Sequence, residues 1–154
     1  QTCALPIWRL PRTIRMTHKF ADAFTLIAPA GAAAAFLALP RYRRQRSEWM
    51  SRQNWLLLEE TSNTGQQLRA WMSKQGWRGE PTMQLDNFDL IINLVALGLG
   101  VSFVPIRALA LYGQKRTLRR LALPDRFMRE LVVVVRKHRK MPSHLASFIE
   151  SILF

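Results

Sequence analysis

A helix and a buried strand meet within twelve residues in the stretch LVALGLGVSFVP, at positions 94–105. The first half has the apolar spacing of a helix that stops at Gly98, and the second half alternates like a strand from Val101 to Pro105. Gly98 provides the helix stop, and Gly100 permits a close approach between backbones. Such a short connection is typical of a fold in which strands and helices alternate along the chain.

The same alternation extends over most of the chain. The apolar patterns predict strands at 23–29, 55–60, 82–86, 101–105, 117–123 and 130–135, and helices at 61–76, 86–98, 106–113 and from Pro142 onward. Together they predict an α/β fold with a mostly parallel sheet flanked by helices.

Four segments carry specific expectations about burial or regularity. The unalternating run ELVVVV at 130–135 predicts a strand covered on both faces. The helix at 86–98 is apolar nearly all round, so we expect burial on most of its sides. Residues 1–22 have no clear period, and residues 30–47 indicate a loop with a helical turn.

The charge of the chain is strongly positive. Lysine and arginine exceed aspartate and glutamate by 23 − 10 = +13, which raises nucleic acid or an anionic membrane surface as a partner. The basic residues form four clusters, and the aromatic residues do not interleave with them as a base-stacking platform requires. A solvated surface is therefore the simpler explanation. The apolar stretch at 24–40 is interrupted by Pro29 and Gly31, so no membrane span is expected and the cytoplasm is the expected location.

Candidate residues for metal binding or catalysis are sparse. Cys3 is the single cysteine, and His18, His138 and His144 share no spacing typical of metal ligands. The sequence also lacks a nucleophile elbow, a zinc-protease motif and a phosphate-binding loop. We therefore expect no metal, no cofactor and no enzymatic activity.

The stretch TSNTG at 61–65 follows a predicted strand and opens a predicted helix. Its hydroxyl, amide and backbone N–H groups can hold a small anion at the positive end of the helix dipole. Ligands of open α/β sheets bind at this edge. The alternative is that these residues only cap the helix.

The order of these segments resembles that of LysR-type transcriptional regulators. The similarity is carried by the TSNTG helix start, by LDNFDLIINLVALGLGVSFVP, and by ELVVVVRK with its following helix. It covers roughly residues 22–154 and corresponds to the C-terminal part of the effector-binding domain of that family. The resemblance implies a periplasmic-binding-protein-like (type 2) lobe with a truncated first lobe, in which the strand at 130–135 lacks its neighbours.

The resemblance also implies a function and a division of the chain. Residues 23–126 would form the second lobe, residues 127–154 the returning strand and helix of the first lobe, and residues 1–22 a remnant of the first lobe or a non-native segment. A small, anionic metabolite would bind between the lobes and change the grip of the intact dimer or tetramer on DNA. DNA itself would be read by a winged helix-turn-helix outside this chain.

Six residues are predicted to contact the effector by this resemblance. They are Ser62, Asn63, Thr64, Gly65, Asn87 and Leu131.

Two other functions remain open from the sequence. A periplasmic solute-binding lobe would share the fold and would be favoured by a cleavable signal peptide. A basic nucleic-acid-binding module would show a steep salt dependence of DNA affinity.

Overall fold

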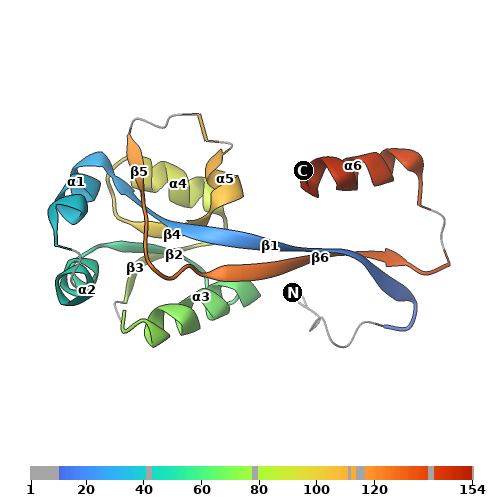
Figure 1. Cartoon of the computed structure of the whole chain (residues 1–154), viewed down its shortest axis with the longest axis horizontal. Helices are drawn as coiled ribbons and strands as arrows, with labels where there is room; N and C mark the ends of the chain where they lie inside the picture. Colours follow the sequence, from blue (N-terminus) through green and yellow to red (C-terminus); the bar gives the residue numbers. More distant parts are fainter. Residues whose placement is uncertain are drawn as a thin grey trace. The chain divides into compact units, whose positions relative to one another are not determined.

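The computed structural model describes residues 11–40, 43–77, 80–110, 112–113, 117–138 and 141–153. Its elements in chain order (Figure 1) are β1 (Ile14–Pro29), α1 (Ala30–Ala38), α2 (Arg43–Ser51), β2 (Trp55–Leu58), α3 (Asn63–Lys74), β3 (Pro81–Leu85), α4 (Phe88–Ala96), β4 (Ser102–Pro105), α5 (Ile106–Ala110), β5 (Leu118–Leu121), β6 (Met128–Arg136) and α6 (Ser143–Leu153). The expected α/β class is confirmed. The chain divides into a central unit, Asp22–Met128, and a terminal unit formed by Gln1–Ala21 and Arg129–Phe154.

Strand pairing in the central unit is mixed. β1 pairs antiparallel with β4 and β5, so that Leu26 lies between Phe103 and Leu121. β2 and β3 pair in parallel, and an isolated parallel bridge joins Trp55 to Val101. The expectation of a mostly parallel sheet is therefore corrected. An apolar run predicts that a strand is buried, but it does not encode the direction of the neighbouring strand.

Successive side chains of β2 enter two different hydrophobic cores. Trp55 and Leu57 lie in one core with apolar residues of α3, whereas Leu56 and Leu58 lie in another with apolar residues of α4. Side chains alternate between the faces of a strand. α3 and α4 therefore cover opposite faces of β2 (Figure 1).

The two glycines between α4 and β4 have the roles that the sequence predicts. Gly98 has a φ of 89°, and its N–H donates to the carbonyl of Val95 at 2.9 Å, which ends the helix. A Cβ atom on Gly100 would overlap the carbonyl oxygen of Asn54. That carbonyl accepts the N–H of Val101 at 2.8 Å, so the close approach is part of the strand connection.

Within the segment 30–47, residues 30–38 and 43–47 are helical, more than the expected loop with a helical turn. It contains α1 and the first part of α2. α1 buries only Ala33 and Phe36, and neither helix has the regular apolar stripe by which a helix is recognised. The intrinsic helix propensity of alanine and arginine is the signal that a search for periodicity misses.

The expected burial of α4 is also corrected. Ile91, Ile92 and Val95 are buried, but Leu90 and Leu97 expose 41% and 76% of their surface. The helix lies over one face of the sheet, so only one side of it can meet the core.

In the terminal unit, β6 pairs with β1. The Thr17 hydroxyl donates to the carbonyl of Val133 at 3.3 Å, and the N–H of Lys137 donates to the carbonyl of Thr13 at 2.9 Å. The partner numbers fall as the numbers along β1 rise, so the two strands are antiparallel. Residues 14–21, expected to be irregular, are therefore strand, while residues 1–10 lie outside the described part.

β6 is less buried than its sequence predicts. Its side chains are half-buried or exposed, and Val134 exposes 42% of its surface. In the described part of the terminal unit α6 is the only helix, so no second helix of this unit is found there to cover the other face of the strand pair. α6 itself buries Ile149 but exposes 58% of Phe148.

Candidate functional site

The parallel strands β2 and β3 bring two helix starts to one edge of the sheet. Leu58 and Leu85 are partners at the carboxyl ends of these strands, and the N–H of Glu59 donates to the carbonyl of Leu85 at 2.9 Å. The chain continues from β2 into α3 and from β3 into α4. We call this place, with residues 59–65 and 86–89, the helix-start edge.

Ser62 is the N-cap of α3. Its Oγ accepts the N–H of Gly65 at 2.9 Å and donates to the carbonyl of Glu59 at 2.8 Å. A Cβ atom on Gly65 would overlap that same carbonyl oxygen. The first turn of α3 is therefore held against the end of β2, and both residues have a packing role independent of any ligand.

Asn63 and Thr64 occupy the first two positions of α3. The Oδ1 of Asn63 accepts a hydrogen bond from the side chain of Gln67 at 3.0 Å, in an exposed position. Residues in the first turn of a helix have N–H groups without an acceptor inside the helix. These two residues are thus placed where a polar ligand would meet the helix start.

Asn87 caps α4 in the same manner. Its Oδ1 accepts the N–H of Leu90 at 2.8 Å, and its Nδ2 donates to Oδ1 of Asp86 at 2.7 Å. The structure thus brings Asn87 to the same edge as Ser62 and its neighbours. Leu131 does not belong to that edge, because it lies half-buried in β6 within the terminal unit.

The helix-start edge carries both positive and negative electrostatic contributions. Two helix N-termini contribute positive potential, whereas four carboxylates, those of Glu59, Glu60, Asp86 and Asp89, contribute negative charge. Glu60 is paired with Arg69, whose Nε lies 2.6 Å from its Oε1. The remaining carboxylates would lower the affinity for an anion.

Neither a cluster suited to a metal ion nor a membrane-spanning helix is found in the described part of the chain. No group of three or more His, Cys, Asp or Glu side chains is arranged there to hold a metal ion. Among the helices described, none has the length and apolarity needed to cross a bilayer.

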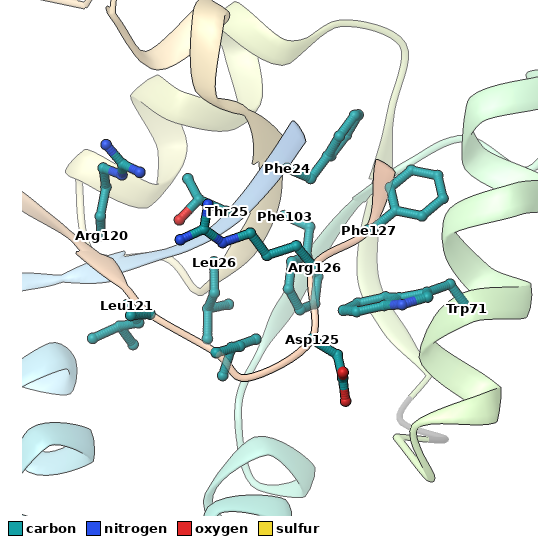
Figure 2. Close-up of a pocket in the computed structure, with 12 residues that line it drawn as sticks. Phe24, Thr25, Leu26, Trp71, Phe103, Arg120, Leu121, Asp125, Arg126 and Phe127 are labelled. Atoms are coloured by element: carbon teal, nitrogen blue, oxygen red, sulfur yellow. The ribbon is translucent and has the colours of Figure 1, made fainter. Parts of the chain in front are cut away.

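The sequence did not indicate a pocket of about 280 Å³ within the central unit (Figure 2). Aromatic and cationic side chains from β1, α3, β4, β5 and the loop after β5 line it: Phe24, Trp71, Phe103, Phe127, Arg120 and Arg126. We call it the aromatic pocket. Its residues lie up to about a hundred positions apart, and no local pattern connects them. Their juxtaposition follows from the pairing of β1 with β4 and β5.

Comparison with known proteins identifies related domains. The model of the family described as LysR substrate binding domain matches residues 5–153. Among solved structures, the CcmR regulatory domain of Synechocystis PCC6803, in complex with 2-PG, is 13% identical with a TM-score of 0.63, covering 94% of this chain and 69% of that one.

Two further structures are similar to the same extent. The effector-binding domain of QuiR in complex with shikimate is 13% identical, with a TM-score of 0.62, over 90% of this chain and 63% of that one. The reduced OxyR regulatory domain of Pseudomonas aeruginosa is 20% identical, with a TM-score of 0.68, over 94% of this chain and 68% of that one. No curated protein sequence matches significantly. The chain thus spans about two thirds of each of these solved domains.

Proposed function

The chain belongs to the LysR substrate-binding domain family, and from this we propose that it senses a small metabolite on behalf of a transcription regulator. The fold of the family is the periplasmic-binding-protein-like type 2 fold, as the resemblance implies. The observation that carries the proposal is the meeting of two helix N-termini at the carboxyl edge of the parallel strands β2 and β3.

The helix-start edge has the groups that a small anion needs. First-turn N–H groups of α3 and α4 and the dipoles of both helices favour negative charge. The side chains of Ser62 and Asn87 are engaged in capping, so we propose that they fix the helix starts. Contact with the ligand is assigned to Asn63 and Thr64, while Gly65 lets the first turn of α3 approach the end of β2.

Two of the similar structures support the proposal that the ligand of this chain is a small molecule. The CcmR domain is in complex with 2-PG and the QuiR domain with shikimate. Both are small molecules, and the described site offers several polar groups within one short stretch of chain. The carboxylate of Asp89, in the first turn of α4, would oppose an anion and so contribute to selectivity.

We further propose the assignment of residues to two lobes that the resemblance implies. Residues 23–126 act as the second lobe and residues 127–154 as the return to the first lobe, consistent with the compact central unit Asp22–Met128. The family match from residue 5 supports a first-lobe origin for the N-terminal segment. Ligand binding would shift the closure of the lobes through its differential affinity for two arrangements.

The intact regulator is proposed to be a cytoplasmic homodimer or tetramer. It would contact DNA through a winged helix-turn-helix outside this chain, and neither catalysis nor a cofactor is part of the proposal. The family assignment favours this function over a periplasmic solute-binding lobe or a nucleic-acid-binding module.

Thermal stabilisation by ligand tests this proposal on the chain itself. Small phosphates and carboxylates, including 2-PG and shikimate, are added singly while unfolding is followed by fluorescence. A ligand at one hundred times its Kd stabilises the folded state by about 2.7 kcal/mol. The double variant Asn63→Ala/Thr64→Val should lose this stabilisation, since it removes two side-chain contacts and leaves the Ser62 cap in place.

The matched control is Thr82→Val/Asn93→Ala, which makes the same chemical changes at exposed positions of β3 and α4 outside the helix-start edge. This control should respond like the natural chain. Equal stabilisation of both double variants would show that the ligand binds elsewhere. Absence of any stabilising compound would contradict the sensing of small anions by this chain.

A further inference from the structure

The aromatic pocket has an apolar body built from interlocked rings. Trp71 meets Phe103 edge-on with 5.3 Å between ring centroids, and Phe24 meets Phe127 with 4.9 Å between centroids. Trp71 also lies 6.0 Å from Phe127. Phe24, Phe103 and Phe127 are also buried, so the wall is formed by packed rings before a ligand arrives.

Two guanidinium groups complement this apolar wall. Arg120 on β5 and Arg126 on the following loop both line the pocket, and neither forms an ion pair with a carboxylate among the described residues. Asp125 lines the pocket as well, but Figure 2 shows its carboxylate pointing away from both guanidinium groups. Arg126 therefore brings unpaired positive charge to the aromatic wall, and Arg120 adds charge from the other face of β5, since it is paired with Ile27 whereas Leu121 is paired with Leu26.

The size of the pocket limits the ligand. A cavity of about 150 Å³ is sufficient for benzene, so a volume of about 280 Å³ holds one ring and a small charged group. A guanidinium group binds a carboxylate in a planar, bidentate manner. The geometry points to a second ligand site in the central unit, one that takes a carboxylate attached to a single aromatic ring.

This site is separate from the helix-start edge. The two sites share no residue. α3 contributes Trp71, near its C-terminal end, to the pocket, and its first turn to the helix-start edge. The inference therefore goes beyond the proposed function and does not depend on it.

Fluorine NMR of the chain with 4-fluorophenylacetate as the probe tests the inference. Binding broadens the probe's resonance, and the dependence on concentration gives a Kd. We expect 4-fluorophenylacetamide, which has the same ring without the charge, and acetate, which has the charge without the ring, to bind at least tenfold more weakly. A tenfold change corresponds to about 1.4 kcal/mol.

Variants separate the pocket from general attraction to a chain of net charge +13. Arg126→Gln and Arg120→Gln should each weaken the probe at least tenfold, because each removes a charged donor. The control Arg44→Gln removes the same charge from α2, at an exposed position outside the pocket, and should change the Kd less than twofold.

Three results would overturn the inference. They are no broadening with a chain that circular dichroism shows to be folded, equal binding of the amide, and equal weakening by Arg44→Gln. The variant Asn63→Ala/Thr64→Val should retain binding of the probe, so failure of the helix-start proposal and failure of this one are distinguishable.

Discussion

Replacing Gly100 by alanine should destabilise the central unit strongly. The added Cβ would overlap the carbonyl oxygen of Asn54 and lie 3.1 Å from its carbonyl carbon, both of them backbone atoms that cannot rotate away. The strand connection must open to admit it. That opening weakens two backbone hydrogen bonds, from Val101 to Asn54 at 2.8 Å and from Leu56 to Val101 at 3.0 Å.

The magnitude follows from these contacts. Two weakened hydrogen bonds cost about 1 kcal/mol each, and inserting a methyl group into a packed site costs about 1–3 kcal/mol. We expect the free energy of unfolding to fall by about 3–5 kcal/mol, and Tm by roughly 6–20 °C for a chain of this length.

Urea unfolding followed by circular dichroism measures the change, and amide hydrogen exchange shows where it acts. The amide protons of Val101 and Leu56 should exchange faster in Gly100→Ala than in the natural chain. The matched control is Gly31→Ala in α1, where a Cβ atom meets nothing within 4 Å. That change should stabilise the chain by up to about 1 kcal/mol. If Gly100→Ala stayed within about 0.5 kcal/mol of the natural chain, the close approach at Asn54 would be refuted as the reason for the glycine.

Two further pairs of substitutions test the cap of α3 and the exposed side of α4. Ser62→Ala removes the acceptor of the Gly65 N–H and should cost about 1 kcal/mol, whereas Ser62→Thr keeps the hydroxyl and should cost less. Identical Tm values for both variants would contradict the capping role. Leu97→Glu should change the free energy of unfolding by less than about 0.5 kcal/mol, because the side chain is 76% exposed. Ile91→Ala, at a fully buried position of the same helix, should cost about 2–5 kcal/mol, and a similar loss in Leu97→Glu would show that α4 is covered on its second side.

Features with a local chemical cause could be predicted from the sequence. Ser62 and Asn87 cap helices because their side-chain oxygens accept backbone N–H groups within three residues. Gly98 and Gly100 were assigned from the pattern that surrounds them. The partner is near in the chain for both caps and for Gly98, whereas the close approach at Gly100 could be predicted without its distant partner, the carbonyl of Asn54.

Features that depend on distant partners could not be predicted. The antiparallel direction of β1 against β4 is set by residues about eighty positions apart, and the run at 130–135 carries no information on what covers it. The aromatic pocket is the clearest case, because Phe24, Trp71 and Arg126 meet only after the sheet has formed. Of the six predicted contact residues, five share the helix-start edge, and their role toward a ligand stays a prediction.

The alternation of β2 between two cores has a consequence for how this chain can change in evolution. A single residue inserted or deleted within Trp55–Leu58 would move the large side chains on one side of the change to the opposite face and disturb both cores at once. Substitutions that keep size and apolarity would be tolerated there, whereas changes of length would not. Length variation among homologues is therefore expected to spare this strand and to accumulate in exposed connections.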